Sequence, residues 1–346
     1  MALHLMEGFD RYGAIADLGL RFTIGSTPVY NSTGGRFGGG CVEVGDSTAE
    51  LVDCILANAA TMDGAGAKVH AAWHFKCTDL PAAASVFASL RTSADVGATL
   101  RVDASGNLTF RKYGNATDIA TSFATIAADS TWHHIEIEAR FAESPNGSCR
   151  IWLDGALVVN VSAVDTLDSG TPSAIDRLRL VGQSSMMFHH DDVVVWDETG
   201  TDFVVTQLDE HKIETLSVQA DDSVQFTPSA STNNTNVDDA AFHDTDTTYN
   251  ESSTVGHVDL FTLVDQAATP VTAHAVGVNI RARKTTADPT VARSRIDIGG
   301  TVVESGDFTL TTSYAHYAAY FGKEPDTSAW DATDIDSLKV GYEYQS

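Results

Sequence analysis

Basic residues are scarce in this chain. Its 346 residues hold 21 Lys and Arg against 47 Asp and Glu, which gives a formal net charge of −26 at pH 7. No Lys or Arg occurs between Ile213 and Ile280. Nucleic acids and anionic membranes are bound through clustered positive charge, so the composition argues against both as partners. We interpret the acid excess mainly as a source of solubility and of protection against self-association.

Cysteine is rare too, and long apolar runs are absent. Cys41, Cys54, Cys77 and Cys149 form no Cys-x-x-Cys pair, so they give neither a zinc nor a redox motif. One or two disulfides stay open as an alternative to buried free thiols. No apolar run reaches the roughly 20 residues of a membrane span. The first residues include Glu7 and no basic region, unlike a secretory signal, so we expect the protein to stay where it is made or to leave by lysis or assembly.

Alternation of apolar and polar residues predicts strands. Between residues 135 and 141 apolar side chains alternate with polar ones, the period of a half-buried strand. Asp154-Gly155 lies between two apolar segments and supplies the positive φ angles of a type I′ hairpin. Residues 104–107 predict a second hairpin between the strand patterns 99–103 and 108–111. Together these signals predict an all-β protein.

The domain organisation follows from further strand patterns and from a shift in composition. Strand patterns recur at 177–181, 192–196, 275–283, 291–298, 309–320 and 338–344. Two segments rich in small residues, 47–60 and 81–90, fit a helix or a strand equally well. Lys and Arg are absent from residues 213–280. We therefore predict a first domain at 1–205, a linker at 206–212 and a smaller, acidic β-sandwich at 213–346.

A series of short motifs runs through both halves. In the first half these are Gly8-Phe9-Asp10, Gly34 to Gly39, Trp132 to Glu136, Asp154-Gly155, Asp165-Thr166 and Asp191 to Gly200. In the second half they are Phe226 to Pro228, Val237 to Asp239, Asp244 to Tyr249, His257 to Phe261, Pro325 and Ala329-Trp330. In order and spacing the first set resembles the concanavalin A-like (laminin G-like) jelly roll, in the version found in virion proteins of tailed bacteriophages. The second set resembles the same phage family, so the resemblance spans nearly the whole chain.

The resemblance implies a fold and a location. The fold is an N-terminal concanavalin A-like jelly-roll sandwich followed by a smaller C-terminal β-sandwich. The function it implies is a non-enzymatic virion structural protein, assembled in the host cytoplasm and released by lysis. We expect a tail fibre- or spike-type appendage that binds other virion proteins or a host-surface glycan and forms a homo-oligomer, with a trimer the first expectation. A capsid decoration or head-fibre protein is the alternative, and the choice between head and tail stays open.

A carbohydrate-active depolymerase is a further alternative. Jelly rolls of this class include glycoside hydrolases, which place two carboxylates on one face of a strand, and Glu136 and Glu138 have that spacing. We interpret the pair instead as the solvated outer face of a strand, because no aromatic-rich acid motif accompanies it. Trp132 and His134 share this face, so Trp132, His134, Glu136 and Glu138 are the candidate ligand-binding residues. No Gly-x-Ser-x-Gly, P-loop or dinucleotide motif occurs, and we predict no enzymatic activity.

No cofactor is required by the sequence, and calcium is the metal it would suit best. The candidate ligands are Asp191, Asp192, Asp244 and Asp246, whose carboxylates are hard oxygen donors of the kind calcium prefers. The habits of laminin G-like folds also imply calcium. No EF-hand loop is present, and we favour exposed loop carboxylates without a metal over a calcium site.

Paired histidines offer a different kind of ligand. His133-His134 and His189-His190 could give imidazole nitrogens to zinc. Adjacent residues of a strand point to opposite faces, so each pair can place only one ring at a given site. We interpret these histidines as structural.

Overall fold

The computed structural model describes the chain except for residues 26–27, 46–49, 62–67, 93–96, 115–116, 168–173, 183–185, 204, 240–246, 267–271 and 287–289. The chain divides into two compact units, Met1–Asp10 with Ala14–Ile213 and Arg11–Gly13 with Glu214–Ser346. Residues 206–212, for which the sequence predicts a linker, belong to the first unit. Each unit is described by itself.

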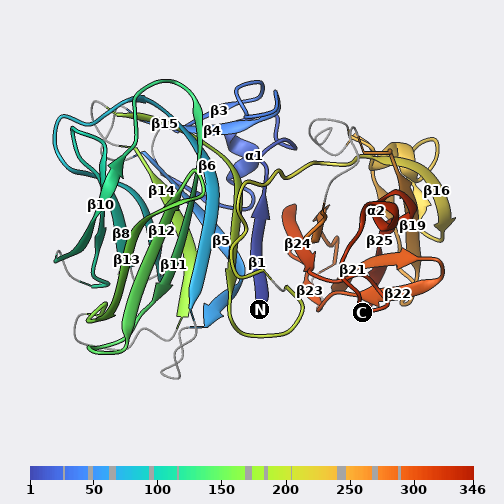
Figure 1. Cartoon of the computed structure of the whole chain (residues 1–346). Coiled ribbons are helices and arrows are strands. Elements are labelled where there is room, and N and C mark those ends of the chain that lie inside the picture. The colour runs from blue at the N-terminus through green and yellow to red at the C-terminus, as the bar shows by residue number, and fades with distance from the viewer. Residues whose placement is uncertain are drawn as a thin grey trace. The chain divides into compact units, whose positions relative to one another are not determined.

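The first unit is almost entirely β-structure (Figure 1). Its elements are β1 (Ala2–Glu7), α1 (Ile15–Leu18), β2 (Thr23–Ile24), β3 (Val29–Asn31), β4 (Cys41–Gly45), β5 (Leu51–Thr61), β6 (Val69–Asp79), β7 (Ser85–Arg91), β8 (Gly97–Val102), β9 (Asn107–Arg111), β10 (Asp118–Thr125), β11 (Trp132–Arg140), β12 (Gly147–Leu153), β13 (Ala156–Val164), β14 (Ala174–Val181) and β15 (Met187–Asp197).

Two antiparallel sheets make up this unit. One has the order β13-β12-β11-β6-β15-β4-β3, with β1 paired to β15, and the other has the order β10-β9-β8-β7-β14-β5-β2. The chain passes from one sheet to the other repeatedly, as it does from β4 to β5 to β6, so strands that pair are often far apart in sequence. The all-β jelly-roll sandwich predicted from the sequence is confirmed.

The core of the first unit lies between the two sheets. Trp73 and Phe75 of β6 contact Phe87 of β7, with ring centroids 5.7 and 5.3 Å apart. All three side chains are fully buried. Burial of a large apolar side chain stabilises a fold by about 1.5–3 kcal/mol, so such contacts hold the sheets together. Because side chains alternate along a strand, the residues between them on β6 point away from this core.

Local predictions can now be compared with the structure. Asp154 and Gly155 have φ angles of 50° and 76°, which confirms the hairpin between β12 and β13. Gly106, with φ of 81°, lies in the predicted turn between β8 and β9. Of the two segments that fitted a helix or a strand, residues 51–60 belong to β5 and residues 85–90 belong to β7. The four cysteines are free and buried, as in the thiol alternative.

The second unit has shorter strands. Its elements are β16 (Val218–Val224), β17 (Thr227–Pro228), the 3₁₀ helix η1 (Asn234–Asn236), β18 (Asn250–Glu251), β19 (Val258–Leu263), β20 (Val276–Ala282), β21 (Val291–Ile298), β22 (Thr301–Glu304), β23 (Phe308–Thr309), β24 (Ala315–Phe321), α2 (Ala332–Ser337) and β25 (Lys339–Tyr344). The largest sheet has the order β16-β19-β25-β21-β22, with β23 paired to β21, while β20 pairs with β24 and β17 with β18.

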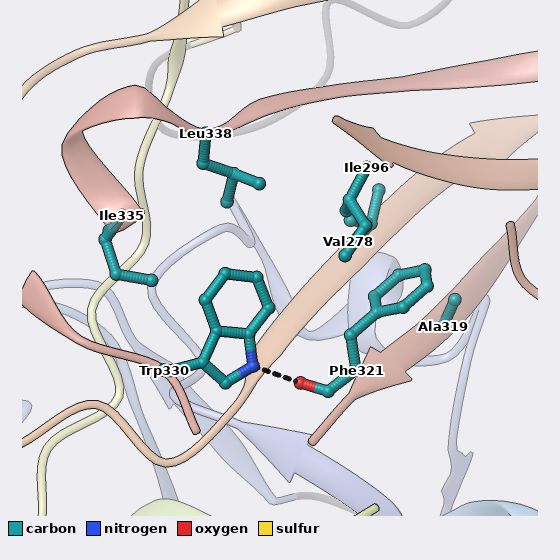
Figure 2. Close-up of a cluster of buried hydrophobic side chains, with 7 residues drawn as sticks. All are labelled: Val278, Ile296, Ala319, Phe321, Trp330, Ile335 and Leu338. Carbon is teal, nitrogen blue, oxygen red and sulfur yellow. Dashed lines mark hydrogen bonds between the residues drawn. The ribbon is translucent and has the colours of Figure 1, made fainter. Parts of the chain in front are cut away.

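A small hydrophobic core holds the sheets of the second unit together. Figure 2 shows Trp330 beside Phe321, and its indole N–H donates to the Phe321 carbonyl at 2.9 Å. The buried cluster consists of Val278, Ile296, Ala319, Phe321, Trp330, Ile335 and Leu338. It joins the β20–β24 pair to the larger sheet and to α2, which makes this unit a smaller sandwich. The two described α-helices have four and six residues, and neither is long enough to cross a membrane.

Candidate functional site

The candidate site is the outer face of the sheet that contains β11. The apolar residues of β11 face the core, so His134, Glu136 and Glu138 of the same strand project from the other side of the sheet. On the neighbouring strand β6, His74 lies directly opposite His134. The outer face of a sheet is ordinarily exposed to solvent, yet Glu136 has no exposed surface and both His134 and Glu138 are buried. This side of the sheet is therefore covered by another part of the unit.

Residues 205–213, named here the covering segment, lie across this face. The backbone N–H of Leu208 donates to Oε2 of Glu136 at 3.0 Å, a contact between residues 72 positions apart. Where the segment begins, the indole N–H of Trp196 donates to the Val205 carbonyl at 2.9 Å. Irregular backbone of this kind must find hydrogen-bond partners when it is buried, and polar side chains of the sheet provide them.

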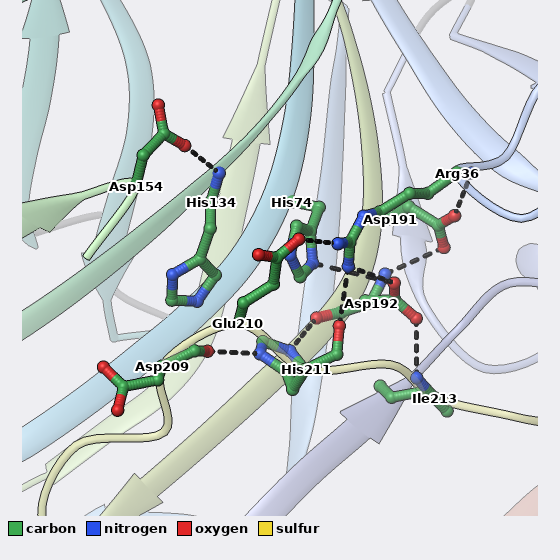
Figure 3. A network of polar contacts seen from close by, with 10 residues as sticks. All are labelled: Arg36, His74, His134, Asp154, Asp191, Asp192, Asp209, Glu210, His211 and Ile213. Atoms are coloured by element: carbon green, nitrogen blue, oxygen red, sulfur yellow. Dashed lines mark hydrogen bonds and ion pairs between the residues drawn. The ribbon is translucent and has the colours of Figure 1, made fainter. Parts of the chain in front are cut away.

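The far end of the covering segment is held in the same way (Figure 3). The backbone N–H of Ile213 donates to Oδ1 of Asp192 at 2.8 Å, and the Arg36 guanidinium donates to the His211 carbonyl at 2.7 Å. Arg36 also forms an ion pair with Glu210. The segment for which the sequence predicts a linker is thus attached to the sheet along its length.

This cover changes the interpretation of the two glutamates. The sequence led us to expect a solvated strand face, and that expectation is wrong for Glu136 and Glu138, because the covering segment and neighbouring side chains bury them. Burial raises the pKa of Glu136 to about 7, a value that suits a general acid. Its carboxylate is, however, bonded to Leu208 rather than open to a substrate. Glu138 lies 3.3 Å from the Lys68 ammonium and 3.6 Å from the Arg150 guanidinium.

Trp132 lies at one end of the same strand. Its side chain is half-buried, and the Lys76 ammonium lies 5.2 Å from the ring centroid, within the range of a cation–π contact. Trp132 is opposite Lys76 in the pairing of β11 with β6, two positions from the His134–His74 pair. Of the four candidate ligand-binding residues, Trp132 is therefore the one that keeps an exposed edge.

Asp191 and Asp192, two of the candidate calcium ligands, lie in an irregular part of β15. Asp192 has a φ of 51°, and the pairing with β6 shifts in register at this point. The Asp191 carboxylate accepts from the backbone N–H groups of Arg36 and Asp192, each at 2.8 Å. Both acids are buried, and burial raises the pKa of each. They occupy a strand rather than the exposed loop that we expected, and the preference for carboxylates without calcium stays a prediction.

The other two predicted calcium ligands, Asp244 and Asp246, lie outside the described residues.

A cluster of three histidines lies where the covering segment meets β6 and β11. His74 of β6, His134 of β11 and His211 each offer a ring nitrogen, and these three nitrogens lie within 4.8 Å of one another. The ring centroids are 4.9 Å apart for His74 with His134 and with His211, and 5.3 Å apart for His134 with His211. Figure 3 shows His74 and His134 projecting from neighbouring strands beside His211.

The environment keeps two of these rings neutral. Burial lowers the pKa of His134 to about 3, and burial also lowers the pKa of His74 well below its ordinary value. Among the described residues, neither ring nitrogen of His74 or His134 has a hydrogen-bond partner. Nδ1 of His74 lies 3.6 Å from Oδ2 of Asp192, beyond hydrogen-bond distance. Buried imidazoles without partners are unusual. His4, His70 and His190 share this property, so what sets His74 and His134 apart is that they lie beside each other and beside His211.

Two other clusters have donor atoms at similar separations. One consists of Cys41, Glu43 and His189, and the other of His70, Glu138 and Glu198. In both, ion pairs already engage would-be ligands, since His189 lies 3.1 Å from Glu43, and the Lys68 ammonium lies 3.3 Å from Glu138 and 3.2 Å from Glu198. They are therefore weaker candidates for a metal than the three-histidine cluster.

Sequence reasoning identified His134 but missed His74 and His211. His74 belongs to a stretch in which His70, Ala72, His74 and Lys76 alternate with apolar residues, and that alternation places it on the polar face of a strand. No comparable signal marks His211, because it lies in an irregular segment and meets the others only through the fold.

Comparisons with known proteins give no family for this chain. No protein-family model matches it, and no curated protein matches it. Solved structures that overlap with it include an endo-β-1,4-glucuronan lyase from Trichoderma reesei, at 15% identity and a TM-score of 0.39 over 56% of this chain and 95% of that one. The metal-free lectin I-B4 of Griffonia simplicifolia overlaps at 8% identity and a TM-score of 0.39 over 56% of this chain and all of the lectin. An alginate lyase overlaps at 11% identity and a TM-score of 0.33 over 56% of this chain and 96% of the lyase. At these scores neither a ligand nor an activity is transferred to this chain.

Proposed function

We propose that this chain is a non-enzymatic structural protein of a tailed-bacteriophage particle, displayed on the surface as a tail fibre- or spike-type appendage. The order of short motifs along both halves of the sequence supports the virion assignment. The absence of catalysis is supported by one structural observation above all: Glu136, one of the two carboxylates of the depolymerase alternative, has no exposed surface and accepts a hydrogen bond from the Leu208 N–H of the covering segment.

The same observation weighs against the depolymerase alternative. A glycoside hydrolase needs two carboxylates that reach opposite sides of one glycosidic bond. Here a sugar would have to displace the covering segment to reach Glu136, and the Glu138 carboxylate is within ion-pair distance of Lys68 and Arg150. Glu136 thus holds the covering segment, whereas Glu138 pairs with cationic side chains beside it.

Exposed aromatic side chains are the parts of the first unit that we propose for binding. Phe123 of β10 exposes 79% of its surface, and Phe37 exposes 56%. The cationic groups of Arg36 and Lys212 lie 4.6 and 5.0 Å from the Phe37 ring centroid. Aromatic rings contribute large contact areas to subunit interfaces, and their faces stack on sugars. A neighbouring virion subunit or a host-surface glycan is the partner that we propose for them.

The virion assignment is tested in particles. Phage particles from cells that carry the gene are purified on a density gradient, and the chain is sought by mass spectrometry and by immunogold labelling. We expect it in the particle fraction, with label on the tail. Label on the head would favour the decoration-protein alternative. Absence of the chain from purified particles would contradict the virion assignment.

The non-enzymatic assignment is tested with surface polysaccharide of the host. The native chain and the double variant Glu136→Gln/Glu138→Gln are each incubated with the polysaccharide, and reducing ends are measured. We expect no release by either protein. Release by the native chain that the double variant lacks would support the depolymerase alternative instead.

A further inference from the structure

We propose that His74, His134 and His211 form a binding site for a divalent transition-metal ion, with zinc the expected ion. The inference is independent of the virion assignment. It rests on geometry: three imidazoles from three separate elements place donor nitrogens within 4.8 Å of one another. Two of the rings are buried and, among the described residues, have no hydrogen-bond partner. A metal ion would give each of them one.

The donor set selects the kind of ion. Imidazole nitrogen is a ligand for zinc and similar transition metals, whereas calcium prefers carboxylate and carbonyl oxygens. Zinc–nitrogen bonds of about 2.0–2.1 Å place tetrahedral ligands about 3.3 Å apart. The cluster must therefore contract by on the order of 1 Å when the ion binds. His211 lies on irregular backbone, so it is the residue whose movement allows that contraction.

The surroundings of His211 match those of a metal ligand. Its Nε2 lies 2.7 Å from the Asp192 carbonyl oxygen, and its Nδ1 lies 3.1 Å from that of Asp209. The nitrogen that binds the ion must turn away from its carbonyl, while the other nitrogen keeps a backbone carbonyl as acceptor. Metal-bound histidines usually donate their second N–H to a carboxylate or a carbonyl, which fixes the tautomer and the ring orientation.

Charge near the cluster permits a dication. Arg36 opposes a cation, but Glu210 forms an ion pair with this guanidinium and the Asp192 carboxylate lies 3.9 Å from it. Asp192 also lies 3.6 Å from His74. An ion bound by His74, His134 and His211 would join β6 and β11 to the covering segment, and would so hold that segment in place over Glu136.

The test uses the full-length chain. The protein is stripped with a chelator, and zinc is titrated calorimetrically in the presence of excess calcium, with cobalt(II) absorption as a probe of coordination. We expect one tightly bound zinc per chain, no displacement by calcium, and a cobalt spectrum of tetrahedral type. The decisive variant is His211→Gln, because a substitution in irregular backbone leaves both sheets intact. It should weaken zinc binding by more than about 100-fold, since loss of an outer-sphere partner alone costs 10- to 100-fold.

Two matched controls keep the outcome specific. The first is His133→Gln, which changes the residue next to His134; the His133 ring lies 2.8 Å from the Asp154 carboxylate. The second is His189→Gln, which changes the Cys41–Glu43–His189 cluster. Both should bind zinc as the native chain does. The proposal is overturned if the native chain does not bind zinc tightly, if calcium displaces the zinc, or if His211→Gln keeps the native zinc affinity. It is also overturned if His189→Gln is the variant that loses zinc binding.

Discussion

Two buried polar sites, one in each unit, differ in how far their hydrogen bonds are satisfied. In the second unit Asp259 has no exposed surface, and it accepts four hydrogen bonds of 2.7–3.1 Å from Gln225, Phe226, Asn233 and Tyr342. In the first unit the rings of His74 and His134 are buried without partners among the described residues. A fully satisfied group stabilises and specifies a fold, whereas a half-satisfied cluster costs stability unless a ligand completes it. The comparison separates the structural polar core of one unit from the candidate site of the other.

The largest effect is expected from the small core of the second unit. Trp330→Ala removes the largest side chain of its buried cluster and the hydrogen bond to Phe321. We expect the free energy of unfolding of this unit to fall by about 3–5 kcal/mol. Hydrogen exchange resolved by peptide measures the two units separately. Trp132→Ala, at a half-buried position of the first unit, is the control and should cost less than about 2 kcal/mol. Equal losses of unfolding free energy for the two variants would contradict the assignment of Trp330 to a tightly packed core and of Trp132 to a half-buried position.

The next effect concerns the satisfied acid. Asp259→Ala leaves four donors without their acceptor, and we expect the second unit to lose about 3 kcal/mol of stability. The matched control is Asp307→Ala, because Asp307 is exposed and pairs with Arg293 at the surface. That pair should contribute about 0–1 kcal/mol. Denaturant unfolding measures both variants, and a loss below 1 kcal/mol for Asp259→Ala would show that its four hydrogen bonds carry little net energy.

A pH-dependent effect of intermediate size is expected at Glu136. Its pKa in the folded protein is about 7, raised by burial above the ordinary value of 4.5. A raised pKa means that the protonated carboxyl is favoured in the fold, so stability is lost as pH rises from 4.5 through 7. Between pH 5 and pH 8 the native chain should lose on the order of 2 kcal/mol relative to Glu136→Gln, which cannot ionise. Parallel pH profiles of unfolding free energy for the two proteins would contradict this.

The smallest effect is expected at the uncovered end of the same face. Lys76→Gln removes the cation over the Trp132 ring, an interaction worth about 0.5–1 kcal/mol at an exposed site. A double-mutant cycle with Trp132→Leu isolates the coupling from other effects of either change. A coupling energy near zero would show that the Trp132 ring is free to stack on a ligand. A value above about 2 kcal/mol would show that the pair is desolvated, like the buried residues under the covering segment.

The sequence predicts what is local and misses what is long-range. Alternation identified β11, and Asp154-Gly155 identified the hairpin beyond β12, because each signal is contained in a few consecutive residues. Residues 47–60 and 81–90 stayed open between helix and strand, since their small side chains favour neither, and pairing within the sheet decided the outcome for β5 and β7. The burial of Glu136 could not be predicted, because it depends on Leu208, 72 residues away.

The central claim is that the covering segment closes the outer face over Glu136 and the three histidines. It is tested most directly by amide hydrogen exchange at Leu208 and Ile213 in the native, full-length chain. Their N–H groups donate to Glu136 and Asp192, so both amides should exchange slowly, like those of β11 beneath them. Exchange at both positions as fast as in an unstructured peptide would mean that the face is open, and the account given for Glu136 would then be wrong.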